Sequence, residues 1–561
     1  MDGSKKDKQR YKFTRHQETK LLRKREDTCV VDEEYSLGDA KESEENQSPF
    51  LSVAKNAMRE ILRLVSITDK SLWRNNINEE VGFILDQKRY MNLNSLFSKL
   101  ISSDRREESS KAELIVRSSG KHLVELILES EKWAKLFPTI VSNARTVKVF
   151  NAGAPGNRNG ALQAMVGEVH ILSPLVPPRE FYFIRYCRQF SDMDWVIVDV
   201  SGDFLFERAN VRNPAYKLPS GCLIREMPDG KSKVTWVEHV MVNEMSQELM
   251  LYKDLTYKYN PFGAKLWLYA LQRMCAKNYF SSIEYFPKHE NDREIRSKEV
   301  RKSVMNLSNR MIQSFCKDLN RAKMNHILTH DTNEYKIHLT SKITNPNAIR
   351  LKCCSNSNGM VVTAMGSVRL HVPPQTIFHF LSDERRRPEW DSLVGEREVH
   401  EVAYISIGER EIQSYNRISI LEMYNDDDDG DDDDNDEEEE EDDDNNNNVQ
   451  IFQEVCIDPV GAYVVYTPVS RRNMHKILNE ENSSDFGILP WGFMISKDGH
   501  VDVDVTSESD HHRKKGSLVT FSIQVLVPAE APLGVTMERL NSIFTTTIEK
   551  IQNALDCEHD D

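Results

Sequence analysis

Apolar residues recur at helical spacing in two segments before the pattern changes to short strands. SVAKNAMREILRLV (52–65) and KHLVELILESEKWAKLF (121–137) each place their apolar side chains on one side of a helix. The runs that follow are separated by Gly-, Pro- and Asn-rich loops such as NAGAPGNRNG (151–160), and they predict strands at 144–150, 161–173, 181–189, 194–200, 221–226 and 233–243. FGAKLWLYALQRMCAKN (262–278) predicts a long closing helix, with Phe262, Leu266, Tyr269, Ala270, Arg273 and Met274 on one side.

The second half of the chain repeats this plan. We predict a helix over 294–319 and an amphipathic helix that begins PPQTIFHFLSDERRRPEWDSL (373–393). The closing helix lies within GVTMERLNSIFTTTIEKIQNAL (534–555), and its stripe includes Leu540, Phe544 and Ile548. Strands are predicted at 335–343, 348–353, 359–371, 397–407, 411–424, 449–458, 461–467 and 516–527. The repeat is one of architecture rather than of residues.

A guanidinium stands in the middle of a strand that looks buried. In EFYFIRYCRQ (180–189), period two puts Phe181, Phe183, Arg185 and Cys187 on one face. Arginine is rarely buried without a partner, so either its head reaches water or it lines a cavity and meets a carboxylate or a ligand head group. A long helix across a curved antiparallel sheet leaves room for an apolar pocket, which favours the cavity.

The acidity of the chain is concentrated in one segment. The net charge is −16, but residues 425–448 hold 17 acids, and the rest carries 72 acids against 73 Lys plus Arg. This run predicts a disordered insertion, which either attracts basic partners or is an inert solvated hairpin tip. Residues 1–25 are basic and close with LLRKR, a candidate nuclear import signal, and residues 26–49 are polar and acidic.

The remaining chemistry points to a binding protein. Nine scattered cysteines show no zinc-ligand spacing and fit a reducing compartment, so we expect no metal and no cofactor. The basic first residues lack the apolar run typical of a secretory leader, and no stretch of 18 apolar residues occurs, so we expect neither secretion nor a membrane span. It lacks the common hydrolase, phosphate-loop and dinucleotide-binding motifs, and His511 and His512 lie in a polar loop. We therefore expect no enzyme and no catalytic residues.

The chain resembles the plant class IV homeodomain–leucine zipper (HD-ZIP IV) transcription factors. REFYFIRYCRQFSDMDWVIVDVS (179–201) and LPSGCLIREMPDGKSKVTWVEHVMV (218–242) are similar to their START domain. The similarity extends through LWRNNINEEVGFILDQKRYMN (72–92), HFLSDERRRPEWD (379–391) and ILPWGFMIS (488–496), and covers about residues 50–556. The later segments resemble the START-adjacent domain of that family.

The resemblance implies an α+β protein with two consecutive domains of the helix-grip type. It implies a START lipid-binding domain over 50–283, a START-adjacent domain over 284–556, and a ligand that is a lipid or sterol. The implied cavity arginine is Arg185, and its implied carboxylate partner is Glu168 in MVGEVHIL. The full set of ligand-binding candidates, for most of which ordinary core packing is the alternative, is Arg185, Glu168, Phe183, Trp195, Trp236, Met241, Phe262, Leu266, Tyr269 and Met274.

The N-terminus departs from the family pattern. QRYKFTRHQETKLL (9–22) resembles the arm and first turns of a homeodomain, but residues 26–47 contain no recognition helix and no zipper heptads follow. We therefore do not expect direct sequence-specific DNA binding. The first hypothesis is a nuclear lipid-binding regulator that contacts other HD-ZIP-type proteins or transcription factors. The alternatives are a ligand-free interaction scaffold, whose cavity its own side chains fill, and a cytoplasmic lipid carrier.

Overall fold

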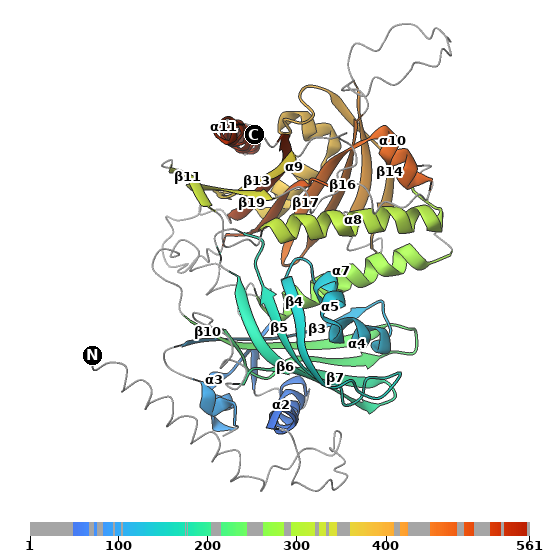
Figure 1. The fold of residues 1–561 in the computed structure, drawn as a ribbon, viewed down its shortest axis with the longest axis vertical. Helices are drawn as coiled ribbons and strands as arrows, with labels where there is room; N and C mark the ends of the chain where they lie inside the picture. The colour runs from blue at the N-terminus through green and yellow to red at the C-terminus, as the bar shows by residue number, and fades with distance from the viewer. Residues whose placement is uncertain are drawn as a thin grey trace, which may run out of the picture.

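The computed structural model consists of two α+β halves, with the helices α7 (Ala264–Ser282) and α8 (Lys298–Leu319) between them (Figure 1). It describes residues 49–557 except for 67–71, 76–81, 94–95, 102–104, 174–175, 177, 203–214, 244–261, 285–292, 320–324, 332–335, 345–358, 409–415, 425–448, 480–486, 499–515 and 529–531. The basic N-terminus, the acidic insertion, the histidine pair and the predicted strand at 348–353 lie outside the described residues.

The first half is built on an antiparallel sheet of order β1-β2-β3-β10-β9-β7-β6-β5-β4, and β8 pairs with β10. Its strands are β1 (Trp73–Asn75), β2 (Phe83–Leu85), β3 (Arg105–Val116), β4 (Val141–Asn151), β5 (Leu162–Val169), β6 (Arg179–Ser191), β7 (Asp194–Val200), β8 (Tyr216–Lys217), β9 (Ser220–Glu226) and β10 (Ser232–Asn243). Its other helices are α2 (Pro49–Val65), α3 (Gln87–Asn92), η3 (Ser98–Leu100), α4 (Gly120–Leu128) and α5 (Ser130–Leu136). The predicted helix over 121–137 is thus two helices, which meet at Glu129.

Both faces of this sheet are covered, because the side chains of each strand alternate between two apolar layers. On β7, Val196 and Val198 join the cluster beneath α2, whereas Trp195 and Ile197 join the cluster on the α7 side. The amphipathic stripe of α2 therefore covers one face. Helices α4, α5 and α7 cover the other face. We call the layer of side chains between that face and these three helices the grip interior.

The second half repeats the arrangement with a sheet of order β11-β12-β13-β19-β18-β17-β16-β15-β14. Its strands are β11 (Asn325–Asp331), β12 (Lys336–Thr344), β13 (Gly359–Leu370), β14 (Glu398–Ser406), β15 (Arg417–Tyr424), β16 (Val449–Asp458), β17 (Gly461–Ser470), β18 (Trp491–Lys497) and β19 (Ser517–Pro528). Its helices besides α8 are α9 (Pro374–Ser382), η7 (Glu384–Glu389), α10 (Arg471–Leu478) and the closing α11 (Leu533–Cys557). The predicted α+β helix-grip class is confirmed.

The two halves are joined by buried polar contacts as well as by apolar packing. Lys277 of α7 donates to Glu454 of β16 at 2.8 Å, and both side chains are at most 2 % exposed. Arg273, one turn earlier, pairs with Asp458 at 3.0 Å and donates to Thr139 at 3.2 Å. Helix α7 is therefore buried on two sides, by its own sheet and by the second one.

Candidate functional site

Arg185 lies in the grip interior and is 2 % exposed. Its Nε and Nη2 donate to the two carboxylate oxygens of Asp199 at 2.7 and 2.8 Å. Asp199 is its direct neighbour on β7, so the pairing follows from the strand register. The third nitrogen, Nη1, donates to the carbonyl of Ile127, near the C-terminal end of α4. A cation is favourable at that end of a helix because it complements the helix dipole.

The predicted partner Glu168 is wrong. Residue 163, not 168, stands opposite Arg185 on β5, and an odd offset puts Glu168 on the other face of the strand. The Glu168 carboxylate instead accepts a hydrogen bond from the Ser142 hydroxyl at 2.6 Å. The interior polar residue of β5 is Gln163, whose amide donates to the carbonyl of Leu128 at 2.6 Å. The carboxylate therefore comes from the following strand rather than the preceding one.

Aromatic rings cover the Arg185 guanidinium. Its Cζ lies 4.3 Å from the ring centre of Trp133 and 5.3 Å from that of Phe183, which is the geometry of cation–π attraction. Trp133 stacks on Trp267 with ring centres 5.9 Å apart, and Trp267 stacks on Trp236 at 5.1 Å. These three indoles form a continuous stack between α5, α7 and β10 that occupies the centre of the grip interior.

A second buried ion pair lies near the first. Lys217 donates to Glu238 at 2.6 Å, and the side chains are 3 % and 7 % exposed. The Lys217 ammonium is 5.8 Å from the Phe183 ring centre, so both interior cations lie close to that ring. The other Glu238 oxygen accepts from Trp236 Nε1 at 3.3 Å. By contrast, Trp133 Nε1 is buried and has no hydrogen-bond partner among the described residues.

Five of the apolar candidates belong to the cluster on the grip side of the sheet. They are Phe183, Trp195, Trp236, Phe262 and Met274. Trp195 lies toward the start of α4, where a Cβ on Gly120 would come within 2.9 Å of the indole. Phe262 lies beneath the Arg179 guanidinium at 3.8 Å. Two of the five contact the interior ion pairs: Trp236 through its hydrogen bond to Glu238, and Phe183 through the two cations near its ring.

Met241 faces away from the interior, so its predicted place there is wrong, and two further candidates lie toward the second half. Met241 packs in the cluster beneath α2, because it has the opposite parity to Trp236 on β10. Leu266 packs against the core cluster of the first half and also lines a cavity between the two halves. Tyr269 is on the same side of α7, where burial and the nearby Asp458 charge raise the pKa of its hydroxyl. The predicted stripe of α7 therefore mixes two faces: Leu266, Tyr269 and Arg273 lie toward the second half, whereas Phe262, Ala270 and Met274 belong to the core cluster of the first half, together with Trp267.

Among the described residues we find no group of three or more His, Cys, Asp or Glu side chains placed to hold a metal ion. Nor does any helix in this part of the chain have the length and apolar character that crossing a bilayer requires. Among the described residues, the polar groups of the grip interior include the two ion pairs Arg185–Asp199 and Lys217–Glu238, Gln163 and the Trp133 indole.

Comparison with known families places this site in a START domain. The START domain model matches residues 94–277, and the model of the PDF2-like C-terminal domain matches residues 297–557. Human StAR-related lipid transfer protein 5 is similar over 42 % of this chain and all of its own, at 12 % identity and a TM-score of 0.28.

The chain belongs to the class IV homeobox–leucine zipper family, as the resemblance implied. It is 33 % identical to homeobox-leucine zipper protein HDG12 of Arabidopsis thaliana over 527 residues, which are 92 % of this chain and 70 % of that protein. It is also 33 % identical to homeobox-leucine zipper protein ROC8 of Oryza sativa subsp. japonica, over 90 % of this chain and 70 % of the relative.

Proposed function

We propose that the grip interior of the first half binds one lipid or sterol and that the protein acts as a ligand-sensing regulator rather than as an enzyme. The polar end of the ligand would lie between the Arg185–Asp199 and Lys217–Glu238 pairs. Its apolar body would lie against Trp133, Trp236 and Trp267. Bound ligand would stabilise the folded first half by mass action and so change its abundance or its choice of partner.

The observation that carries this proposal is that charged and polar side chains lie buried within the otherwise apolar grip interior. A buried ion pair contributes little net stability compared with apolar residues of the same volume, because both charges lose their hydration. Two such pairs beside an unpartnered Trp133 Nε1 therefore have no evident structural advantage. They offer donors and acceptors to a hydroxyl or a charged head group, for which charge-assisted hydrogen bonds are strong.

The indole stack favours a second candidate, a ligand-free interaction scaffold. All three guanidinium nitrogens of Arg185 already donate within the protein. A ligand must therefore displace an indole from the stack before it can reach the guanidinium. If the rings stay in place, the protein would act by binding the partners of its full-length relatives.

We further propose a nuclear location and contacts with other HD-ZIP-type proteins or transcription factors. The family membership supports both. Residues 1–25, which hold the predicted import signal and the homeodomain-like arm, lie outside the described residues. A reporter fused to residues 1–25 distinguishes this proposal from the cytoplasmic lipid carrier. If the protein is nuclear, we expect the reporter to accumulate in the nucleus, and we expect Ala substitutions of the Lys and Arg residues in LLRKR to abolish that accumulation. A cytoplasmic carrier predicts no nuclear accumulation.

The first test is native mass spectrometry of the full chain after incubation with sterol and phospholipid mixtures. We expect a reproducible added mass that is lost when both partners are removed in Arg185→Met/Asp199→Leu. Removing both avoids leaving an unpaired buried charge. Trp133→Phe keeps an aromatic side chain but removes Nε1, and should weaken retention of the ligand. Trp195→Phe is the matched control, since its Nε1 donates to the Asn157 carbonyl instead.

Circular dichroism must show the same fold in all variants. Added mass that survives in Arg185→Met/Asp199→Leu would place the ligand elsewhere. A wild-type chain that retains none of the lipids offered would favour the scaffold.

A further inference from the structure

The second half has an interior of its own beneath α9, η7 and the closing helix α11. We call this layer the second interior, and its apolar cluster includes Ile377, Trp390, Phe493, Phe521 and Phe544. Arg387 of η7 lies in the same layer, because its Nη1 donates to Gln453, which has the same parity on β16 as Val455 of that cluster. The Arg387 side chain is 1 % exposed.

Two buried N–H groups of the second interior have no hydrogen-bond partner among the described residues. They are Arg387 Nη2 and Trp390 Nε1. The other two guanidinium nitrogens have acceptors, since Nε donates to Asp391 at 2.8 Å and Nη1 donates to Gln453. Arg387 Cζ lies 5.0 Å from the Trp390 ring centre, so one ligand can reach both donors. A buried donor without an acceptor destabilises the folded protein, and a bound acceptor would relieve that loss.

The surroundings of the two donors define the polar end of such a ligand. Asp391, which is as deeply buried as Arg387, already compensates the guanidinium charge. A charged ligand would therefore bury a charge without a partner, which favours an uncharged one. A carbonyl oxygen has two lone pairs and no proton, so it can accept from both donors. A hydroxyl group would add a proton that needs an acceptor of its own.

A row of aromatic rings leads away from these donors and offers a wall for an apolar body. Trp390 meets Phe493 edge-on with ring centres 5.4 Å apart, and Phe493 stacks on Phe521 at 4.3 Å. The Phe521 ring centre is in turn 5.3 Å from that of Phe544 on α11. The row therefore runs from η7 through β18 and β19 to the closing helix. Aromatic side chains offer large apolar contact areas to such a ligand.

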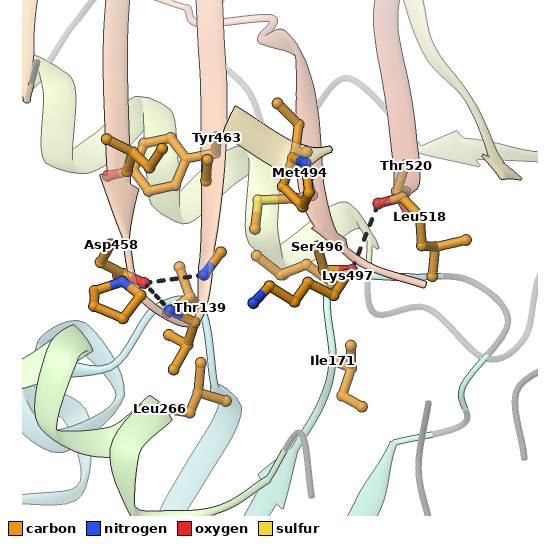
Figure 2. Close-up of a pocket in the computed structure, with 18 of the residues that line it drawn as sticks. Thr139, Ile171, Leu266, Asp458, Tyr463, Met494, Ser496, Lys497, Leu518 and Thr520 are labelled. Carbon is orange, nitrogen blue, oxygen red and sulfur yellow. Dashed lines mark hydrogen bonds between the residues drawn. The ribbon is translucent and has the colours of Figure 1, made fainter. Parts of the chain in front are cut away.

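The closing helix of the first half is fixed on both sides. Its outer residues contact the second half through the Arg273–Asp458 and Lys277–Glu454 pairs. Leu266, on the same side of α7, lines the cavity between the two halves (Figure 2). Helix α7 therefore cannot move outward without breaking buried ion pairs.

The closing helix of the second half lies at its outer edge (Figure 1). Helix α11 buries one stripe that includes Phe544 and Ile548, whereas Glu538, Ser542 and Glu549 on its other side are exposed. The Phe544 ring rests against Gly366, where a Cβ would come within 2.6 Å of it. An outward movement of α11 would therefore free a ring-sized space beside the aromatic row.

We propose that the second interior binds an uncharged apolar molecule through a carbonyl oxygen. The oxygen accepts from Arg387 Nη2 and Trp390 Nε1. The apolar body lies along Phe493 and Phe521, in the space that Phe544 leaves as α11 moves outward. Bound ligand stabilises the folded second half by mass action. This site is separate from the grip interior of the first half and does not rest on the lipid proposed there.

Photocrosslinking of the full chain with benzophenone, an uncharged aromatic ketone, tests the site. On irradiation its carbonyl carbon bonds to a neighbouring C–H carbon while its oxygen takes the hydrogen, so peptide mass spectrometry locates the bound molecule. We expect saturable labelling of η7, β18, β19 or α11. Fluorenone should compete with this labelling. Fluorene has the same rings without the oxygen and should compete at least about tenfold less well, because it cannot accept a hydrogen bond from a charged donor.

Variants of the two donors separate their N–H groups from packing. Trp390→Phe keeps an aromatic side chain but removes Nε1, and should raise the half-saturating benzophenone concentration about threefold or more. Arg387→Lys keeps a cation beside Asp391 but removes Nη2, and should also raise it. Trp491→Phe in β18 is the matched control, because its Nε1 already donates to the Gln524 carbonyl at 2.9 Å, and it should leave labelling unchanged. Circular dichroism must show the same fold in all three variants.

Four results would overturn the proposal. They are adducts confined to the first half, labelling that does not saturate, competition by fluorene as strong as that by fluorenone, and equal weakening by Trp390→Phe and Trp491→Phe. The first of these would leave the lipid proposed for the grip interior unaffected, because the position of the adduct distinguishes the two sites.

Discussion

The two halves have the same strand order but place their buried guanidinium on different elements. In the first half, Arg185 of β6 faces Asp199 of β7. The corresponding neighbours on β16 and β17 are Gln453 and Tyr466, which are uncharged. There the guanidinium comes from Arg387 of η7, which donates to Gln453 and lies 4.2 Å from the Tyr466 ring centre.

Each half nevertheless puts a tryptophan of the preceding helical segment beside that cation. Arg387 Cζ is 5.0 Å from the Trp390 ring centre, and Arg185 Cζ is 4.3 Å from that of Trp133. The shared feature is thus a buried cation against an indole, reached from two directions. The comparison indicates that both halves keep a buried guanidinium against a tryptophan ring, although different elements supply the arginine in each half.

The largest expected effect concerns thiol reactivity in the two halves. Burial raises the pKa of Cys187 and Cys316 from 9.0 to about 12, and that of Cys456 to about 11. Because only the thiolate reacts, Cys187 and Cys316 should alkylate about a thousandfold more slowly at pH 8 in the folded protein than in the unfolded chain. Iodoacetamide labelling followed by peptide mass spectrometry measures this rate residue by residue.

On heating, thiols of both halves should become reactive together, because the Lys277–Glu454 pair and α7 connect them. Cys187 and Cys275 report on the first half, and Cys316 and Cys456 on the second. Labelling of one set well before the other would show that the halves unfold independently.

Removing either buried guanidinium should be the most destabilising single change. Taking one partner from a buried ion pair costs about 3–5 kcal/mol, because the remaining charge stays buried. Arg387 pairs with the buried Asp391 at 2.8 Å. We expect Arg185→Met to cost more stability than Arg387→Met, because the Asp391 left behind still accepts from the backbone N–H of Leu393 at 2.9 Å. Denaturant unfolding of the full chain gives both values. Arg185→Met/Asp199→Leu is the control and should recover much of the loss; no recovery would mean that the pair is not the cause.

Strand β3 shows why part of the fold could not be predicted from one sequence. Its sequence RREESSKAELIV lacks regular alternation and begins with charges. Two of its charged side chains are buried because they find distant partners: Glu108 pairs with Arg179 at 2.6 Å, and the Lys111 ammonium donates to the Val65 carbonyl at 3.3 Å. Apolar periodicity cannot detect a strand whose burial depends on ion pairs formed across the sheet.

The candidate site was predicted only in part, for a related reason. Period two correctly put Arg185 and Phe183 on the interior face. The identity of the carboxylate required the register between β6 and β7, which the residues of one strand do not contain. On α7, both sides are apolar because both are buried, so spacing alone favoured Leu266 and Tyr269 over Trp267. The family resemblance predicted the START domain correctly, but it did not indicate which face of α7 lies toward the grip interior.

Two buried glycines, one in each half, allow the halves to be compared through substitutions that should destabilise the protein less than loss of a buried guanidinium. A Cβ on Gly366 of β13 would lie 2.6 Å from the Phe544 ring, and one on Gly167 of β5 would lie 3.0 Å from the Trp133 ring. Overpacking a core typically costs about 1–3 kcal/mol. We expect Gly366→Ala to be the more destabilising of the two in thermal unfolding. Equal or stabilising effects would show that the rings shift freely, which would also favour opening of the indole stack for a ligand.

The smallest expected effect comes from matched serine N-caps. Ser119 accepts from the His122 N–H at the start of α4, and Ser470 accepts from the Asn473 N–H at the start of α10, both at 3.3 Å. Each Ser→Ala change should cost about 1 kcal/mol, and each Ser→Gly change a few tenths. The other end of α4 is held by Arg185 and Gln163, which donate to Ile127 and Leu128. Because those contacts limit fraying to the first turn, we expect equal costs in denaturant unfolding. A clearly larger loss of unfolding free energy for Ser119→Ala would mean that loosening the start of α4 also disturbs the Arg185 site. The grip interior would then respond to a change at the N-cap of α4.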